Sequence, residues 1–155
     1  MRLVWRLCSP PYASKLDGEG NRRHGARWNS PGRGVVYVSA HLSLAVLEML
    51  AHLPPELTMA VPPLAAVAIE IPDRSEELVS LEEMPKDPAI LATWCRARGD
   101  AWLRSGSALS LVAPSLIVPQ ELNVMLNPSH SDMQTVRIAA VEEFRLDERL
   151  LVRSF

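Results

Sequence analysis

Two charged residues in the segment 25–50, GARWNSPGRGVVYVSAHLSLAVLEML, have surroundings that suit chemistry. Arg27 lies beside a tryptophan in a glycine-containing turn, and Glu48 lies in the middle of an apolar run. A guanidinium in such a turn is well placed to bind a phosphate through two parallel N–H bonds. A carboxylate among apolar side chains is costly unless it is paired or solvated in a cleft. The segment therefore contains a candidate phosphate ligand and a candidate pocket carboxylate.

Both residues also have plainer explanations. One explanation of Glu48 is a structural salt bridge with an arginine. The other is a position in a pocket, where water or a ligand satisfies the carboxylate. For Arg27 the two explanations are a solvated side chain on a loop and a side chain that binds a phosphate group. Spacing along the chain does not decide between these alternatives.

Two of the few aromatic residues, Trp28 and Tyr37, lie in the same segment. Tyr37 alternates with Val36 and Val38 on an expected strand, so it points to the opposite face from both valines. Core packing explains both aromatics. The alternative is stacking on a flat ring, with the polar ends of the side chains bonded to a ligand.

The elements that position these residues are short strands and two helices. The helix expected at residues 40–53 has Ser39 as its N-cap, stops at Pro54-Pro55, and is apolar all round, which predicts burial. A second helix is expected at residues 87–106, beginning at Asp87 or Pro88, with Gly99 as a break or weak point. Residues 9–34 read as an irregular segment. Strands are expected at residues 3–7, 35–39, 64–71, 107–119 (strand, turn, strand), 123–130 (a strand ending in a turn) and 137–145, with a short turn around Asp147.

The pattern of these elements indicates an α+β fold. Because strands and helices do not alternate regularly, a doubly wound parallel sheet is disfavoured, and we expect one compact domain over residues 1–155 with a mixed, mainly antiparallel sheet. A chain of 155 residues is long enough for one substantial core and too short to suggest two.

Composition narrows the function classes. A formal net charge of −2 gives no basic field for nucleic acid, although the cluster of Arg22, Arg23, Arg27 and Arg33 suits a smaller anion. The amino terminus lacks the apolar region of an export signal, and no segment reads as membrane-spanning, so we expect a cytoplasmic protein. The two cysteines and four histidines show no metal-ligand spacing.

Three segments together resemble the RES domain, the toxin of RES–Xre toxin–antitoxin modules, over essentially the whole chain. They are the 25–50 segment, PSLIVPQELNVMLNPSH and the closing FRLDERLL. The family is named for an arginine, a glutamate and a serine, which match Arg27, Glu48 and Ser115 here. Ser115 is favoured over nearby serines by the PS dipeptide before an apolar run and the NVMLNP that follows. Arg6 matches a further arginine of the family's pocket.

The resemblance implies a fold similar to ADP-ribosyltransferase toxins and a type II toxin that consumes NAD as substrate without a metal. Cleavage of the nicotinamide–ribose bond by hydrolysis or phosphorolysis would deplete NAD and arrest growth; transfer of ADP-ribose to a protein is the alternative reaction. By this resemblance the diphosphate lies against Arg6 and Arg27. Glu48 stabilises the oxocarbenium-like transition state.

The same resemblance assigns Trp28 and Tyr37 to the nicotinamide and ribose pocket. Ser115 would bond the ribose or a phosphate, or hold Glu48 or Arg27 in place. It further implies an Xre-type helix-turn-helix antitoxin as partner and a homodimer of toxins, with no direct contact to nucleic acid. The competing hypothesis belongs to a different class of function. In it, the chain is a non-catalytic nucleotide-binding or interaction domain in which Arg27 and Glu48 form a structural ion pair.

Overall fold

The computed structural model describes residues 1–54, 56 and 60–151. Within these residues, seven strands form one sheet in the order β4-β5-β6-β2-β1-β3-β7, and all neighbours are antiparallel except the parallel pair β4 and β5. The expected mixed, mainly antiparallel α+β fold is confirmed. The strands are β1 (Arg2–Cys8), β2 (Val36–Ser39), β3 (Leu64–Ile71), β4 (Glu76–Leu78), β5 (Ser110–Pro114), β6 (Leu122–Leu126) and β7 (Arg137–Phe144). The helices are α1 (Glu19–His24), α2 (Leu42–Ala51) and α3 (Pro88–Ser105), with 3-10 turns η1 (Pro10–Tyr12), η3 (Ser131–Thr135) and η4 (Glu148–Leu150).

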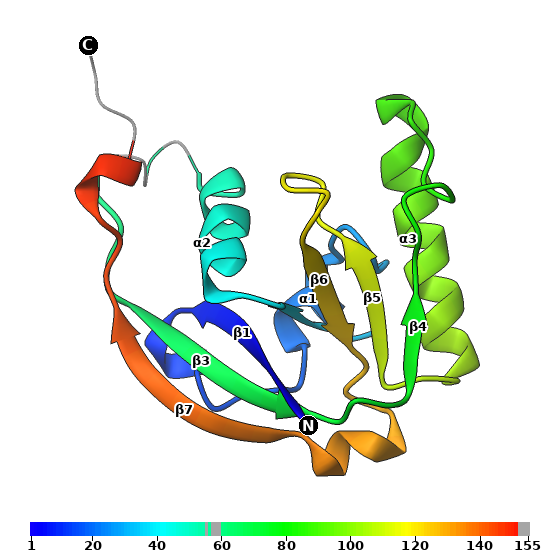
Figure 1. Ribbon diagram of the computed structural model, residues 1–155, viewed down its shortest axis with the longest axis horizontal. Coiled ribbons are helices and arrows are strands. Elements are labelled where there is room, and N and C mark those ends of the chain that lie inside the picture. Colours follow the sequence, from blue (N-terminus) through cyan, green and yellow to red (C-terminus); the bar gives the residue numbers. More distant parts are fainter. Residues whose placement is uncertain (55, 57–59, 152–155) are drawn as a thin grey trace.

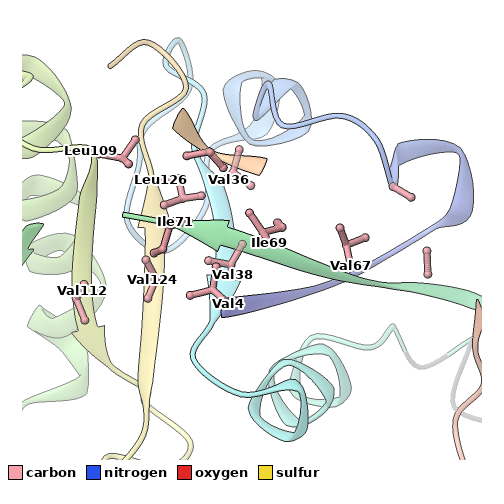
Figure 2. Close-up of a cluster of buried hydrophobic side chains, with 13 residues drawn as sticks. Val4, Val36, Val38, Val67, Ile69, Ile71, Leu109, Val112, Val124 and Leu126 are labelled. Atoms are coloured by element: carbon pink, nitrogen blue, oxygen red, sulfur yellow. The ribbon is translucent and has the colours of Figure 1, made fainter. Parts of the chain in front are cut away.

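The two faces of the sheet carry separate clusters of buried side chains. Val36 and Val38 belong to the cluster shown in Figure 2, where side chains of β1, β2, β3, β5 and β6 converge. Tyr37 packs instead against the cluster that contains Trp28 and Trp102. The predicted opposite orientation of Tyr37 is therefore confirmed, because successive side chains of a strand alternate between faces.

Most of the expected strands form where apolar residues cluster. β3 matches its expected range, residues 64–71, since it lies between β1 and β7 and is apolar at nearly every position. The expected second strand near residues 116–119 is wrong. After β5 the chain turns instead, because the Ser115 hydroxyl accepts hydrogen bonds from the backbone N–H groups of Ile117 and Val118. Neither the short β4 nor α1 was predicted, and α1 lies within residues 9–34, which were expected to be irregular.

α2 differs from its expected form in two ways. Ser39 is the last residue of β2 and not the N-cap, a position that His41 occupies. The helix is not buried all round: only Leu44 and Ala45 are buried, and Leu47 is 40% exposed. α2 ends at Ala51, before Pro54. Pro55 lies outside the described residues.

α3 begins as expected and is not interrupted. Asp87 caps it by accepting a hydrogen bond from the backbone N of Ala89 at 2.9 Å. Gly99 is neither a break nor a weak point, because a Cβ atom there would lie 1.7 Å from the carbonyl oxygen of Trp28. The glycine permits α3 to pack directly against that backbone. Figure 1 shows α3 along the β4 and β5 end of the sheet, whereas α2 packs against β1 and β2. No helix within the described ranges has the length and apolar character needed to cross a membrane.

Candidate active site

A cavity of about 480 Å³ brings together residues that lie far apart in the sequence. β1 and β2 are neighbours in the sheet, and α2 packs against both, so side chains from all three elements reach one space. The 26–28 turn closes another side. Five of the six residues singled out from the sequence line this cavity: Arg6, Arg27, Trp28, Tyr37 and Glu48.

The Glu48 carboxylate is held by two uncharged groups. Its Oε1 accepts a hydrogen bond from the Ser115 hydroxyl at 2.8 Å and another from the side-chain amide of Asn123. Among the described residues, the structure contains no ion pair between Glu48 and Arg27 or any other cation. Neutral donors orient the carboxylate without cancelling its charge, so the structural salt bridge considered above is absent.

Ser115 supports Glu48 and is itself buried, with 1% of its surface exposed. Its hydroxyl donates to Glu48 and accepts from the backbone of Ile117 and Val118 at 3.0 and 3.1 Å. The hydroxyl is thereby fixed by the turn after β5. Of the roles open to Ser115, this geometry suits the one in which it holds Glu48.

Asn123 is a site residue that the sequence did not reveal. It lies on β6 directly across from Ser39 on β2, and the Ser39 hydroxyl donates to its Oδ1 at 2.7 Å. This bond fixes the side-chain amide so that its nitrogen faces Glu48. The available signal was one amide in the apolar NVML run, but only the β2–β6 register shows that Ser39 and Glu48 are its partners.

Trp28 and Tyr37, the two aromatic residues predicted from the sequence to line a pocket, are also structural. The Tyr37 hydroxyl accepts from the backbone N of Trp28 at 3.0 Å and donates to Oδ1 of Asn29 at 2.7 Å. Burial raises the pKa of Tyr37 well above its usual value, so the phenol stays neutral. Trp28 packs edge-on against Trp94, with ring centroids 6.2 Å apart. Core packing therefore explains the positions of Trp28 and Tyr37. Both residues also line the cavity.

α3 fixes the turn that carries Arg27. The backbone N and the hydroxyl of Ser30 both donate to the Asp100 carboxylate, at 2.8 and 2.5 Å. Gly99, the preceding residue, lies against the Trp28 carbonyl. The backbone of the turn is therefore held at Trp28 and at Ser30.

The two arginines bring positive charge to the same cavity. Arg27 is exposed, and its guanidinium makes no hydrogen bond or ion pair within the described part of the chain. Arg6 uses one N–H group, on Nη1, to bond the carbonyl oxygen of Lys15 at 2.6 Å. Both side chains retain donors for an anion. In the described ranges, no group of three or more histidine, cysteine, aspartate or glutamate side chains is arranged to hold a metal ion.

The family model of the RES domain matches residues 3–147. The chain belongs to the RES family. A RES relative from Yersinia enterocolitica, named Toxin Res, is 36% identical over 155 residues, which cover 96% of this chain and 99% of that protein. The Prs ADP-ribosylating toxin of a Sphingobium species is 31% identical over 157 residues, covering 95% of both chains.

A solved structure shares the RES fold of this chain. A chain of the M. tuberculosis MbcT–MbcA toxin–antitoxin complex superimposes with a TM-score of 0.75 at 15% sequence identity. The match covers 92% of this chain and 84% of the other. At this identity the likeness establishes the fold, in agreement with the family match.

Proposed function

We propose that this chain is the toxin of a type II toxin–antitoxin system and that it consumes NAD by breaking the nicotinamide–ribose bond. The observation that carries the proposal is the Glu48 carboxylate, fixed by neutral donors in a cavity that Arg6 and Arg27 also line. A carboxylate beside two cations suits a substrate that holds a diphosphate and develops positive charge during reaction. The relatives named Toxin Res and Prs ADP-ribosylating toxin support both parts of the proposal.

In this mechanism Arg6 and Arg27 bind the diphosphate and Glu48 lies against the ribose that carries nicotinamide. When the bond between C1′ and the nicotinamide nitrogen breaks, its electron pair leaves with nicotinamide, which becomes neutral. The ribose ring is left with positive charge, which the carboxylate stabilises. An acceptor oxygen or nitrogen then bonds to C1′, and a neutral acceptor loses a proton.

The test is to mix the purified chain with NAD and identify the products by mass spectrometry. Water as acceptor gives ADP-ribose, inorganic phosphate gives ADP-ribose phosphate, and a protein acceptor gains the mass of ADP-ribose. Glu48→Gln keeps the shape and removes the charge, so we expect the rate to fall by about 10²–10³. Arg27→Ala should also lose most activity. Glu82→Gln, an exposed glutamate outside the cavity, is the matched control.

These variants decide whether the site is correctly assigned. Circular dichroism should show that Glu48→Gln and Arg27→Ala fold as the wild type does. Wild-type consumption of NAD by both variants would refute the roles of Glu48 and Arg27. No consumption of NAD by the wild type, together with normal growth on expression, would favour a non-catalytic nucleotide-binding or interaction domain.

Transfer of ADP-ribose to a protein is the second candidate reaction, favoured by the name of the Sphingobium relative, Prs ADP-ribosylating toxin. It uses the same bond cleavage and differs only in the acceptor. Radiolabel from the adenylate part of NAD would appear on protein if this reaction occurs. Label confined to small molecules would exclude it.

The proposal extends to the cellular setting. We infer a single domain over residues 1–155 acting in the cytoplasm, an Xre-type helix-turn-helix antitoxin as partner, and a homodimer of toxins in the complex. The neighbouring structure, a toxin–antitoxin complex, supports an antitoxin partner. Co-expression with an antitoxin of this helix-turn-helix type should restore growth, and light scattering of the purified complex would give its stoichiometry.

A further inference from the structure

His52 lies at the end of α2, four positions after Glu48, and lines the same cavity. Residues four apart on a helix lie on one face, and their side chains point toward the helix N-terminus. The imidazole of His52 therefore reaches back to the turn that carries Glu48, and its Nδ1 lies 2.8 Å from the Glu48 carbonyl oxygen. One turn of helix thus brings a carboxylate and an imidazole to one space.

The contact with the carbonyl oxygen fixes the tautomer of the His52 ring. A carbonyl oxygen only accepts hydrogen bonds, so the proton of the neutral imidazole is on Nδ1 and Nε2 holds a lone pair. Within residues 1–54, 56 and 60–151, Nε2 makes no hydrogen bond or ion pair. A histidine that is oriented through one ring nitrogen and has a lone pair on the other is suited to general base catalysis.

The same contact also caps the helix. The backbone N–H of His52, which would be the helical partner of the Glu48 carbonyl, donates to Met49 instead at 3.2 Å. The imidazole replaces that missing donor. Capping uses Nδ1 and leaves Nε2 free, so the two roles are compatible. A side-chain amide, which can donate to the carbonyl but cannot take up a proton, separates them.

The exposure of His52 suits proton exchange with water. The side chain is exposed, whereas Glu48 is half-buried and accepts hydrogen bonds from Ser115 and Asn123. An acceptor that enters the cavity from solvent can therefore meet the imidazole, and a proton on the ring can leave to water after each turnover. The mechanism above requires such a group, because a neutral acceptor must lose a proton.

We propose that His52 is the general base that takes the proton of the acceptor, an inference that rests on the proposed function. After the bond between C1′ and the nicotinamide nitrogen has broken, a lone pair of the acceptor atom forms the new bond to C1′. The electron pair of the acceptor's bond to hydrogen stays on that atom, and the proton passes to Nε2. The imidazolium then releases it to water. The acceptor is therefore a neutral nucleophile that carries a proton, as water does.

The variant His52→Asn separates the base from the cap. With water as acceptor in phosphate-free buffer, its kcat for NAD should fall by about 10²-fold or more, with KM within about twofold. His130→Asn is the matched control. A ring nitrogen of His130 accepts from the backbone N of Asp132 at 3.1 Å, a bond that an asparagine oxygen can also accept, and His130 lies outside the cavity. This control should keep the wild-type kcat.

Azide supplies a readout that a purely structural role of His52 would not change. Azide is an anion with no proton to lose, so it can attack C1′ without a base. Added azide should restore NAD consumption by His52→Asn, with ADP-ribosyl azide as the product found by mass spectrometry. A variant in which the cavity is only distorted would not be restored.

The pH dependence of the wild type gives a second measurement that needs no variant. Histidine is the side chain whose charge ordinarily changes between about pH 5 and 8. With water as acceptor, kcat should fall as the pH is lowered through this range, because protonated Nε2 cannot accept a proton; with azide this fall should be absent. A change in any other ionisable group of the described cavity wall would affect both reactions alike. These groups are Arg6 on β1, Arg27 in the 26–28 turn, Tyr37 on β2 and Glu48 on α2.

The outcomes separate this inference from the proposed function. Wild-type kcat in His52→Asn, or a loss that azide does not restore in a variant folded by circular dichroism, would overturn the role of His52 while the wild type still consumes NAD. So would a requirement for inorganic phosphate, whose anionic oxygens need no base. If His52→Asn does not fold, parallel pH profiles with water and azide would overturn it. Failure of the wild type to consume NAD would overturn the proposed function, and this inference with it.

Discussion

The contact between Gly99 and Trp28 leads to a prediction whose sign is opposite to that expected from helix propensity. In an exposed helix interior, replacing glycine by alanine stabilises by about 1 kcal/mol. At Gly99 the new Cβ atom would lie 1.7 Å from the Trp28 carbonyl oxygen, well inside any allowed carbon–oxygen contact. α3 and the 26–30 turn must therefore move apart in the Gly99→Ala variant.

The size of the effect follows from what that movement disturbs. Overpacking costs about 1–3 kcal/mol and occasionally more. The bonds from Ser30 to Asp100 start one residue further along α3, and loss of a hydrogen bond to a charged group costs about 1.5–3 kcal/mol. After the helix-propensity gain is subtracted, we expect a net loss of about 3 kcal/mol. For a chain of this size that is a fall in Tm of about 6–12 °C.

Calorimetry and urea unfolding followed by tryptophan fluorescence measure this change. Gly20→Ala is the matched control, since Gly20 lies in α1 and a Cβ atom there meets nothing within 4 Å. That variant should be as stable as the wild type or slightly more stable. If Gly99→Ala unfolds at or above the wild-type temperature, the close approach of α3 to the turn is not a constraint in solution and the reasoning is wrong.

Two further predictions concern the hydrogen bonds of the site. Asn123→Ala removes one of the two donors to Glu48 and should lower kcat for NAD by about tenfold with little change in KM; an unchanged kcat would show that Asn123 does not position Glu48. The raised pKa of Tyr37 means that the unfolded chain releases this proton at lower pH than the folded chain, so wild-type stability should fall as the pH rises above about 10. Tyr37→Phe should be less stable at pH 7, because Trp28 N–H and Asn29 Oδ1 lose a partner, yet should show a shallower fall in urea midpoint between pH 9 and 11. An equal fall in both proteins would assign the alkaline loss to other groups.

The parts of the fold that were predictable have local causes. β3 and the start of α3 follow from an apolar run ending before Pro72 and from the Asp87-Pro88 pair. β4 was missed because its three residues, two of them glutamates, form a strand only by pairing in parallel with β5. The 116–119 run is apolar enough for a strand, but the Ser115 hydroxyl turns it. In each failure a contact beyond the local pattern decided the structure.

The residues of the candidate site also differ in how far the sequence could predict them. Arg27 and Glu48 stand out by residue type in their own segments, and the family resemblance pointed to Ser115. Asn123 depends on the β2–β6 register and on α2 packing over those strands, which one sequence does not contain. Gly99 was read as a weakness of α3, because its reason is a backbone 71 positions earlier in the numbering, at Trp28.

The interior of the 26–30 turn has a consequence for binding kinetics. Asn29 is fully buried, its amide nitrogen lies 3.0–3.2 Å from three backbone carbonyl oxygens, and its Oδ1 accepts from Tyr37. Protein groups therefore order this turn before any ligand arrives, and little conformational entropy is left to be lost on binding. Association of a ligand with Arg27 should be a single fast phase with no slow ordering step, and rigid inhibitors should bind without a penalty for reshaping the turn.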